Sequence, residues 1–116
     1  YLEVSRLTDK DAVMVFSVGG GDAFREVSRN IIHGLSYAQK VGARILGIVG
    51  RDGGYTAGVA QACIVVPTVN KDRVTPHTEE LQAVLWHLIV WSLKVNESKW
   101  ESLKYVKSGM HTGPVL

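Results

Sequence analysis

The chain has 116 residues, of which 46% are hydrophobic and 21% charged, the proportions of an ordinary globular domain. Thirteen Lys and Arg against eleven Asp and Glu give a formal net charge of +2 with no run of one sign, which argues against a nucleic-acid partner. No apolar stretch reaches the roughly twenty residues of a membrane span, since His87 interrupts residues 83–95. We therefore expect a soluble domain without nucleic-acid or membrane partners.

The single cysteine and the first residue bear on the setting of the chain. Cys63 lies in the apolar run CIVV and has no partner for an internal disulfide, which fits a reducing cytoplasm and a packing role. We therefore expect a cytoplasmic protein. The chain begins with Tyr1 instead of Met, which predicts that it starts inside something longer or has been trimmed.

The first elements in chain order are a strand and a helix separated by three glycines. The unbroken apolar run 12–18 predicts a strand buried on both faces. Asp22 is a suitable N-cap after the glycines, and Gly42 supplies a C-terminal stop. Between them, apolar residues recur at helical spacing and predict an amphipathic helix: Phe24, Val27, Ile31, Leu35 and Ala38.

The same alternation continues to residue 95. The sequence predicts a strand over 44–49, a turn at GRDGG, a short helix over 55–61 and a strand over 62–66. A long helix follows to about Val95, with Thr75 as cap and Pro76 at its first position. Residues 1–95 form the predicted domain, and 96–116 are an extension predicted as a helix followed by a loose tail.

This order predicts an α/β fold, a three-layer, doubly wound parallel sheet of the flavodoxin-like kind. Three strands are too few for such a sheet to bury its edges and helix faces, so the fold is apparently incomplete. The long helix has an apolar face of Leu81, Leu85, Leu88 and Ile89. We expect the chain to form a homo-oligomer or to associate with a complementary half.

Ligands of parallel sheets bind at the carboxyl ends of the strands, so the turns after Val18, Val49 and Val66 are the candidate site. FSVGGGD is the strongest of these, because glycine amides and a helix N-terminus form an anion cradle to which Ser17 adds a hydroxyl. Alternatively, the glycines only form a tight turn and Asp22 only caps the helix. The spacing is neither G-x-G-x-x-G nor a P-loop, which disfavours dinucleotides and nucleoside triphosphates.

Four stretches together resemble a known family. FSVGGGD, KVGARILGIVGRDGG, AGVAQACIVVP and HTEELQAVLWHLIVW resemble sugar isomerase (SIS) domains, and phosphoheptose isomerases in particular. The resemblance covers Asp11 to about Leu93 and corresponds to the C-terminal half of such a domain. It implies that a first half with its own strands, a second phosphate loop and a catalytic glutamate is missing, cleaved or a separate chain.

The resemblance also assigns the loop. The family's phosphate loop is similar to S-x-S-G-x-S, in which Ser17 matches the first serine and Gly20 the glycine, while Gly19 and Asp22 replace the other serines. It implies substrate binding by Ser17 to Asp22, that is Ser17, Val18, Gly19, Gly20, Gly21 and Asp22, and by Glu79. A carboxylate in place of a hydroxyl should weaken phosphate binding unless Asp22 points back as a cap.

A histidine in the long helix of the family is a catalytic acid or base, and it aligns with His87. The resemblance implies His87 and Glu80 as catalytic residues, and seven residues of spacing place them on one helix face. Without the family, a lone histidine among Leu85, Trp86 and Leu88 is more often a core residue. His77 borders the site or is simply exposed at the helix entry.

The resemblance implies an aldose-ketose isomerase that converts sedoheptulose 7-phosphate to a heptose 7-phosphate by proton transfer through an enediol, with this chain incomplete for turnover. The alternatives are a non-catalytic phosphosugar-binding or regulatory module, or a structural role. No organic cofactor is expected. Some relatives bind zinc near this place, which makes His87 with Glu79 or Glu80 candidate ligands, although two ligands do not make a site.

Overall fold

The computed structural model describes the backbone of residues 1–107 and the side chains of residues 1–97. The chain divides into two units, Tyr1–Gln82 and Ala83–Leu116, and each is treated by itself. The first unit contains the sheet and the helices that pack on it, and it also contains the candidate site.

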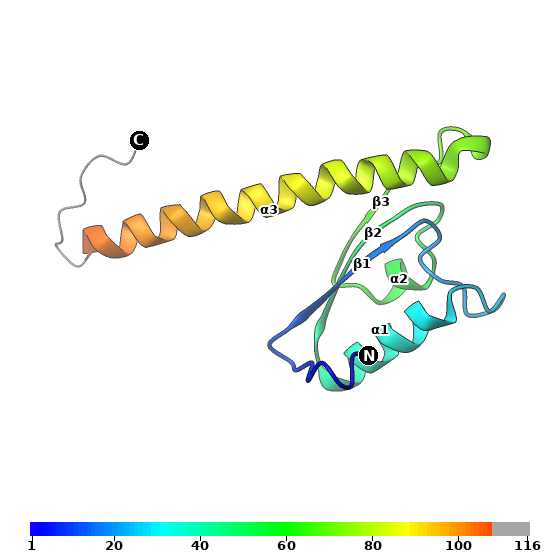
Figure 1. Cartoon of the computed structure of the whole chain (residues 1–116), viewed down its shortest axis with the longest axis horizontal. Coiled ribbons are helices and arrows are strands. Elements are labelled where there is room, and N and C mark those ends of the chain that lie inside the picture. Colours follow the sequence, from blue (N-terminus) through cyan, green and yellow to red (C-terminus); the bar gives the residue numbers. More distant parts are fainter. Residues whose placement is uncertain (108–116) are drawn as a thin grey trace. The chain divides into compact units, whose positions relative to one another are not determined.

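The sheet has three parallel strands in the order β1-β2-β3, which confirms the predicted α/β class (Figure 1). The strands are β1 (Ala12–Ser17), β2 (Arg44–Val49) and β3 (Ala62–Val65). All three were expected within one residue of these bounds. In the register of the first pair, Ala12 lies opposite Arg44 and Ser17 opposite Val49, so both strands end at the same level.

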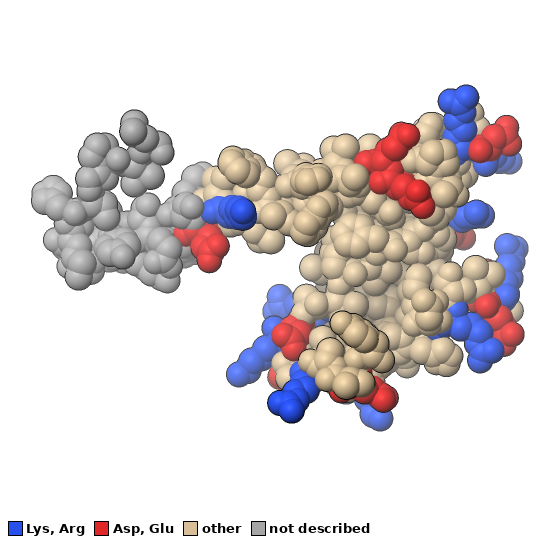
Figure 2. All heavy atoms as spheres, in the orientation of Figure 1, with Lys and Arg blue, Asp and Glu red and all other residues tan. Residues whose placement is uncertain are grey.

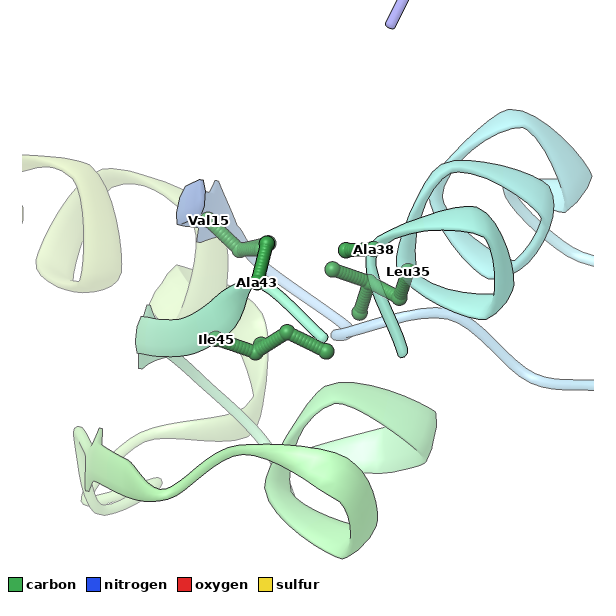
Figure 3. Close-up of a cluster of buried hydrophobic side chains, with 5 residues drawn as sticks. All are labelled: Val15, Leu35, Ala38, Ala43 and Ile45. Atoms are coloured by element: carbon green, nitrogen blue, oxygen red, sulfur yellow. The ribbon is translucent and has the colours of Figure 1, made fainter. Parts of the chain in front are cut away.

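Two helices pack on one face of this sheet. α1 (Arg29–Val41) and α2 (Gly54–Val59) contact each other, and both contact β2. Figure 1 shows both on the same side of the strands. Strand and helix side chains meet in a core drawn in Figure 3, made of Val15, Leu35, Ala38, Ala43 and Ile45. Apolar burial of this kind contributes roughly 25 cal/mol per Å² and stabilises the helix-covered face.

The opposite face of the sheet is only partly covered. Ile48 is completely buried, whereas Phe16 and Ile64 are 45% and 42% exposed. A parallel sheet in a complete α/β protein is covered on both faces. The first unit is therefore consistent with part of a flavodoxin-like fold, as the small number of strands predicted.

The helix expected directly after the glycines begins later, which corrects the prediction. Asp22 is not its N-cap: α1 starts at Arg29 after Ser28, which has a left-handed φ of 55° and makes no side-chain cap. Between them the chain doubles back, because the amides and carbonyls of Asp22 and Val27 exchange two hydrogen bonds of 3.0 Å. Phe24 is consequently fully exposed instead of packed.

A 3-10 turn, η1 (Lys71–Arg73), leads into α3 (Val74–Lys107). α3 therefore begins at the residue before the predicted cap Thr75, and it continues beyond Val95 into the segment expected to be helical. The predicted loose tail falls largely on residues 108–116, outside the described residues. No helix in the described part of the chain is both long enough and apolar enough to span a membrane.

Candidate functional site

Two glycine-rich turns meet backbone to backbone at the carboxyl ends of β1 and β2. A β-carbon on Gly20 would lie 2.0 Å from the carbonyl oxygen of Gly53. A β-carbon on Gly54 would likewise come within 2.2 Å of the carbonyl oxygen of Gly19. Gly20, Gly53 and Gly54 also have positive φ, which glycine adopts without steric cost. These glycines therefore allow the two turns to approach each other closely.

Hydrogen bonds fasten the two turns together. The amide of Tyr55 donates to the carbonyl of Gly21 at 2.7 Å. Thr56 donates to the carbonyl of Gly20 twice, from its amide at 2.9 Å and from its hydroxyl at 2.7 Å. The Thr56 side chain is fully buried, so these bonds are shielded from water. The loop after β1 is thereby held in one conformation by the start of α2.

A cavity of about 870 Å³ opens beside these turns. Its wall is formed by residues from the loop after β1, the turn after β2 and the segment after β3, represented by Gly19, Arg51 and Thr68. All three segments follow strands, which is where a ligand of a parallel sheet is expected. The volume suffices for a small phosphorylated metabolite, since ligand pockets span roughly 300 to 1,000 Å³.

The glycine loop offers this cavity two free backbone donors. The amide of Gly20 is occupied, because it donates to the Ser17 hydroxyl oxygen at 3.0 Å. The amides of Gly19 and Gly21 have no hydrogen-bond acceptor within the described residues, and both glycines line the cavity. The Ser17 hydroxyl accepts from within the loop and keeps its own proton to donate. Two glycine amides are thus available to bind a ligand, instead of the three that a cradle of three glycines would offer.

The Asp22 carboxylate is turned back into its own loop. Its Oδ1 accepts hydrogen bonds from the amides of Phe24 at 2.9 Å and Arg25 at 3.0 Å. Its Oδ2 lies 3.7 Å from Nε of Arg25. The residue therefore organises an Asx turn instead of capping a helix, and its charge has a neighbouring cation. The carboxylate thus points back into its own loop without capping α1, and it still lines the cavity.

Cations reach the cavity from all three segments. Arg25, Arg51 and Lys71 line it, together with the carboxylates of Asp22 and Asp52. Asp52 also accepts a hydrogen bond from the amide of Gly54 at 3.2 Å. Three cations against two carboxylates leave a formal excess of one positive charge, which favours an anionic ligand.

Of the predicted loop residues, Val18, Gly19, Gly21 and Asp22 line the cavity, whereas Ser17 and Gly20 do not. The predicted residues of the long helix also lie outside the cavity wall. Glu79 and Glu80 are exposed in the first turns of α3, and His77 is half-buried there. His87 belongs to the second unit, where it is exposed and its ring lies 6.2 Å from that of Trp86. The binding role of the loop from Ser17 to Asp22 and the roles of Glu79, Glu80 and His87 therefore all stay predictions.

Three buried polar residues that support the site were missed in the sequence. Besides Thr56, these are Thr78, which fills the space beside Gly50, and Gln82, whose Nε2 donates to the carbonyls of Ser17 at 3.2 Å and Ile48 at 2.7 Å. Gln82 thereby ties the end of β1 to the end of β2. Its position one residue after Leu81 in an apolar-rich helix was the available signal.

Metal and thiol chemistry find little support in the described residues. Across them, no group of three or more His, Cys, Asp and Glu side chains converges on a point that could hold a metal ion. Zinc binding by His87 with Glu79 or Glu80 stays a prediction. Partial burial raises the pKa of the Cys63 thiol, which reduces its thiolate fraction at neutral pH, and Cys63 lies in β3 away from the cavity wall.

Curated proteins with related sequences share part of this chain. The phosphoheptose isomerase of Chlorobium phaeobacteroides is 41% identical over 64 residues, 54% of this chain and 26% of the relative. That of Syntrophotalea carbinolica is 29% identical over 87 residues, 74% of this chain and 39% of the relative. The lincomycin biosynthesis protein LmbN of Streptomyces lincolnensis is 31% identical over 77 residues, 66% of this chain and 28% of the relative.

The chain spans about a quarter to two fifths of the length of the curated relatives it matches. No family model matches it. The names of the relatives nevertheless suggest a relationship with the SIS family and point to a family of isomerases, in agreement with the resemblance of the sequence motifs.

Proposed function

We propose that this chain is the C-terminal part of a phosphosugar isomerase of the phosphoheptose isomerase type. The observation that carries the proposal is the cavity at the strand ends, where free amides of Gly19 and Gly21 and an excess of positive charge face one space. Such a site suits the phosphorylated end of a sugar. The curated relatives named phosphoheptose isomerase support the same substrate class.

In the proposed reaction the sugar is held by its phosphate, and a proton moves between two neighbouring carbons through an enediol. His87 transfers the proton as acid or base, with Glu80 as its catalytic partner on the same helix, and Glu79 contacts the sugar. A second acid or base comes from the rest of the protein, because removal and return of a proton need both. The reaction converts sedoheptulose 7-phosphate to a heptose 7-phosphate and requires no organic cofactor.

The proposal includes a cytoplasmic protein that forms oligomers. Phosphorylated sugars are cytoplasmic metabolites, and the lone Cys63 suits a reducing compartment. Subunit association would cover the exposed face of the sheet.

A second candidate, a non-catalytic phosphosugar-binding module, is favoured by one observation. The residues that line the cavity in the described part of the chain include cations and hydroxyls but no histidine. Binding without turnover needs no group that titrates near neutral pH.

The substitution His87→Asn in the full-length protein separates the two candidates. Asparagine keeps a polar group of similar reach and removes the titrating nitrogen, so an isomerase should lose roughly a hundredfold in kcat, the usual scale for a proton-transfer group. Turnover of sedoheptulose 7-phosphate and the melting temperature are measured together. Unchanged kcat with a lower melting temperature would assign His87 to packing. A wild-type protein that binds the sugar phosphate without turning it over would establish the binding module.

A further inference from the structure

Arg51 is a cation of the cavity wall without an ion-pair partner among residues 1–97. Within residues 1–97, neither Arg51 nor Lys71 has a carboxylate within 4.0 Å, whereas Arg25 lies beside Asp22. The two acidic side chains of the wall are also engaged, since Asp22 and Asp52 both accept backbone amides. With Arg25 beside Asp22, the excess of one positive charge comes from Arg51 and Lys71, which lie in different turns, against Asp52.

The backbone of Arg51 is in a conformation that its side chain disfavours. Its φ is 52°, in the left-handed region, inside a turn closed by the amide of Gly53 donating to the carbonyl of Gly50 at 3.0 Å. Glycine or asparagine adopts this conformation more readily than arginine does. Turn geometry alone thus does not explain an arginine here, and strained residues of this kind cluster where a ligand is held.

The side chain of Arg51 runs along the glycine loop. Its Cδ and Nε lie 3.8 and 4.0 Å from the point where a β-carbon on Gly19 would stand. Because Gly19 has no side chain, the arginine stem reaches the part of the cavity wall from which a loop hydroxyl would otherwise donate. The Nε end of the guanidinium therefore lies beside Gly19, whose amide is free.

We propose that Arg51 is the principal phosphate-binding side chain of this cavity and that Lys71 is the second cation on the same phosphate group. The assignment rests on the proposed phosphosugar function. A guanidinium is always charged and offers paired N–H donors that match two phosphate oxygens, whereas Lys71 acts as a point charge. Together with the two amides, they supply the donors that the glycine loop lacks as side chains.

The test uses the purified chain and inorganic phosphate, with affinity measured by calorimetry and folding by the melting temperature. Arg51→Gln should weaken phosphate binding about tenfold or more, and Lys71→Gln by a smaller factor, since bonds to charged groups are worth more than neutral ones. Arg44→Gln is the matched control, because Arg44 is an exposed arginine at the opposite end of β2 and does not line the cavity. This control should bind within twofold of the original chain.

The substitution Arg51→Gly distinguishes phosphate binding by Arg51 from a purely structural role. Arg51→Gly relieves the left-handed φ, so its melting temperature should equal or exceed that of the original chain while phosphate binding is lost. A lower melting temperature with retained binding would overturn the assignment. So would an Arg51→Gln protein that binds within twofold, an equal loss in Arg44→Gln, or no phosphate binding by the original chain at millimolar concentrations.

The outcome also separates this inference from the proposed function. Arg51-dependent phosphate binding in a full-length protein that does not turn over sedoheptulose 7-phosphate keeps the assignment and removes the isomerase. Turnover whose KM is unchanged by Arg51→Gln keeps the isomerase and removes the assignment.

Discussion

Gly20 is the residue at which the contact between the two turns is tightest. Its φ of 70° and the carbonyl of Gly53 leave no room for a side chain. Gly58, in α2, provides a contrast, because a β-carbon there would meet nothing within 4 Å and its φ is not positive. The structure thus requires glycine at position 20 but not at position 58, and alanine substitutions test this difference.

We expect Gly20→Ala to destabilise the fold by roughly 3 kcal/mol, the sum of a left-handed alanine and a backbone overlap. Gly58→Ala should stabilise it by up to roughly 0.5 to 1 kcal/mol, because alanine has a higher helix propensity than glycine. Urea denaturation of both variants is the measurement. Equal stabilities for the two variants would contradict the close approach at Gly20.

Asp22 both stabilises a turn and places a negative charge at the cavity wall, and Asp22→Asn separates these two effects. The amide oxygen of asparagine can accept the bonds from Phe24 and Arg25, while the negative charge at the cavity wall is removed. Phosphate should bind about two- to fivefold more tightly, on the scale of a single charge near water. Asp9→Asn, at an exposed residue outside the cavity wall, is the control for net charge. Unchanged affinity in Asp22→Asn would show that Arg25 already neutralises the carboxylate.

At the scale of elements, Gln82 joins the beginning of α3 to two strands. It is buried, and its Nε2 donates to carbonyls at the ends of β1 and β2. The substitution Gln82→Met keeps the volume and removes both donors, so it should cost about 1 to 3 kcal/mol of stability. Thermal unfolding of Gln82→Met beside Glu80→Gln tests this, since Glu80 is exposed and its substitution should stay within about 0.5 kcal/mol. Equal melting temperatures would assign Gln82 no supporting role.

The strands were predictable because their signals are uninterrupted: apolar runs such as 12–18 are bounded by polar residues or glycine. The start of α1 was not. Phe24 and Val27 fit the helical spacing of Ile31 and Leu35. However, the Asp22 carboxylate accepts hydrogen bonds from the amides of Phe24 and Arg25 and forms a turn in place of the first helical turn. Turn chemistry therefore prevailed over periodicity, because side-chain hydrogen bonds to nearby amides compete with helix formation.

The location of the candidate site was predictable, but the contributions of Arg51 and Arg25 to it were not. Strand order alone places the three turns at one end of the sheet, and the glycine loop marks that end. The contribution of Arg51 depends on a left-handed turn and on its passage beside Gly19, neither of which a sequence pattern encodes. Pairing of Asp22 with Arg25 likewise depends on how the loop doubles back.

At the scale of the whole molecule, large apolar side chains remain exposed. Leu88 and Trp91 on α3 are 58% and 67% exposed, and residues 83–97 carry only Lys94 and Glu97 as charged residues. In Figure 2 the coloured surface of this stretch is accordingly mostly tan, while charged side chains gather on the first unit. An apolar surface of this kind is typical of an interface.

We expect the purified chain to associate with itself or with a complementary half. Light scattering at micromolar concentration should give a mass above that of one chain, and Trp91→Glu should lower it, because a charge would be buried unpaired in the interface. Lys94→Glu, which also adds negative charge to the same helix, is the control and should lower the mass less than Trp91→Glu does. A monomer that unfolds cooperatively and shows no exposed-surface dye binding would contradict the expectation.

The hydrogen bonds between the turns at Gly20 and Gly53 should also couple the motions of these two parts of the chain. Because carbonyls of the first turn accept the amides of Tyr55 and Thr56, opening either turn breaks hydrogen bonds that hold the other. Local opening should therefore involve both segments in one event, and a ligand that contacts either of them stabilises both. Two of the three segments that line the cavity should therefore order and loosen together.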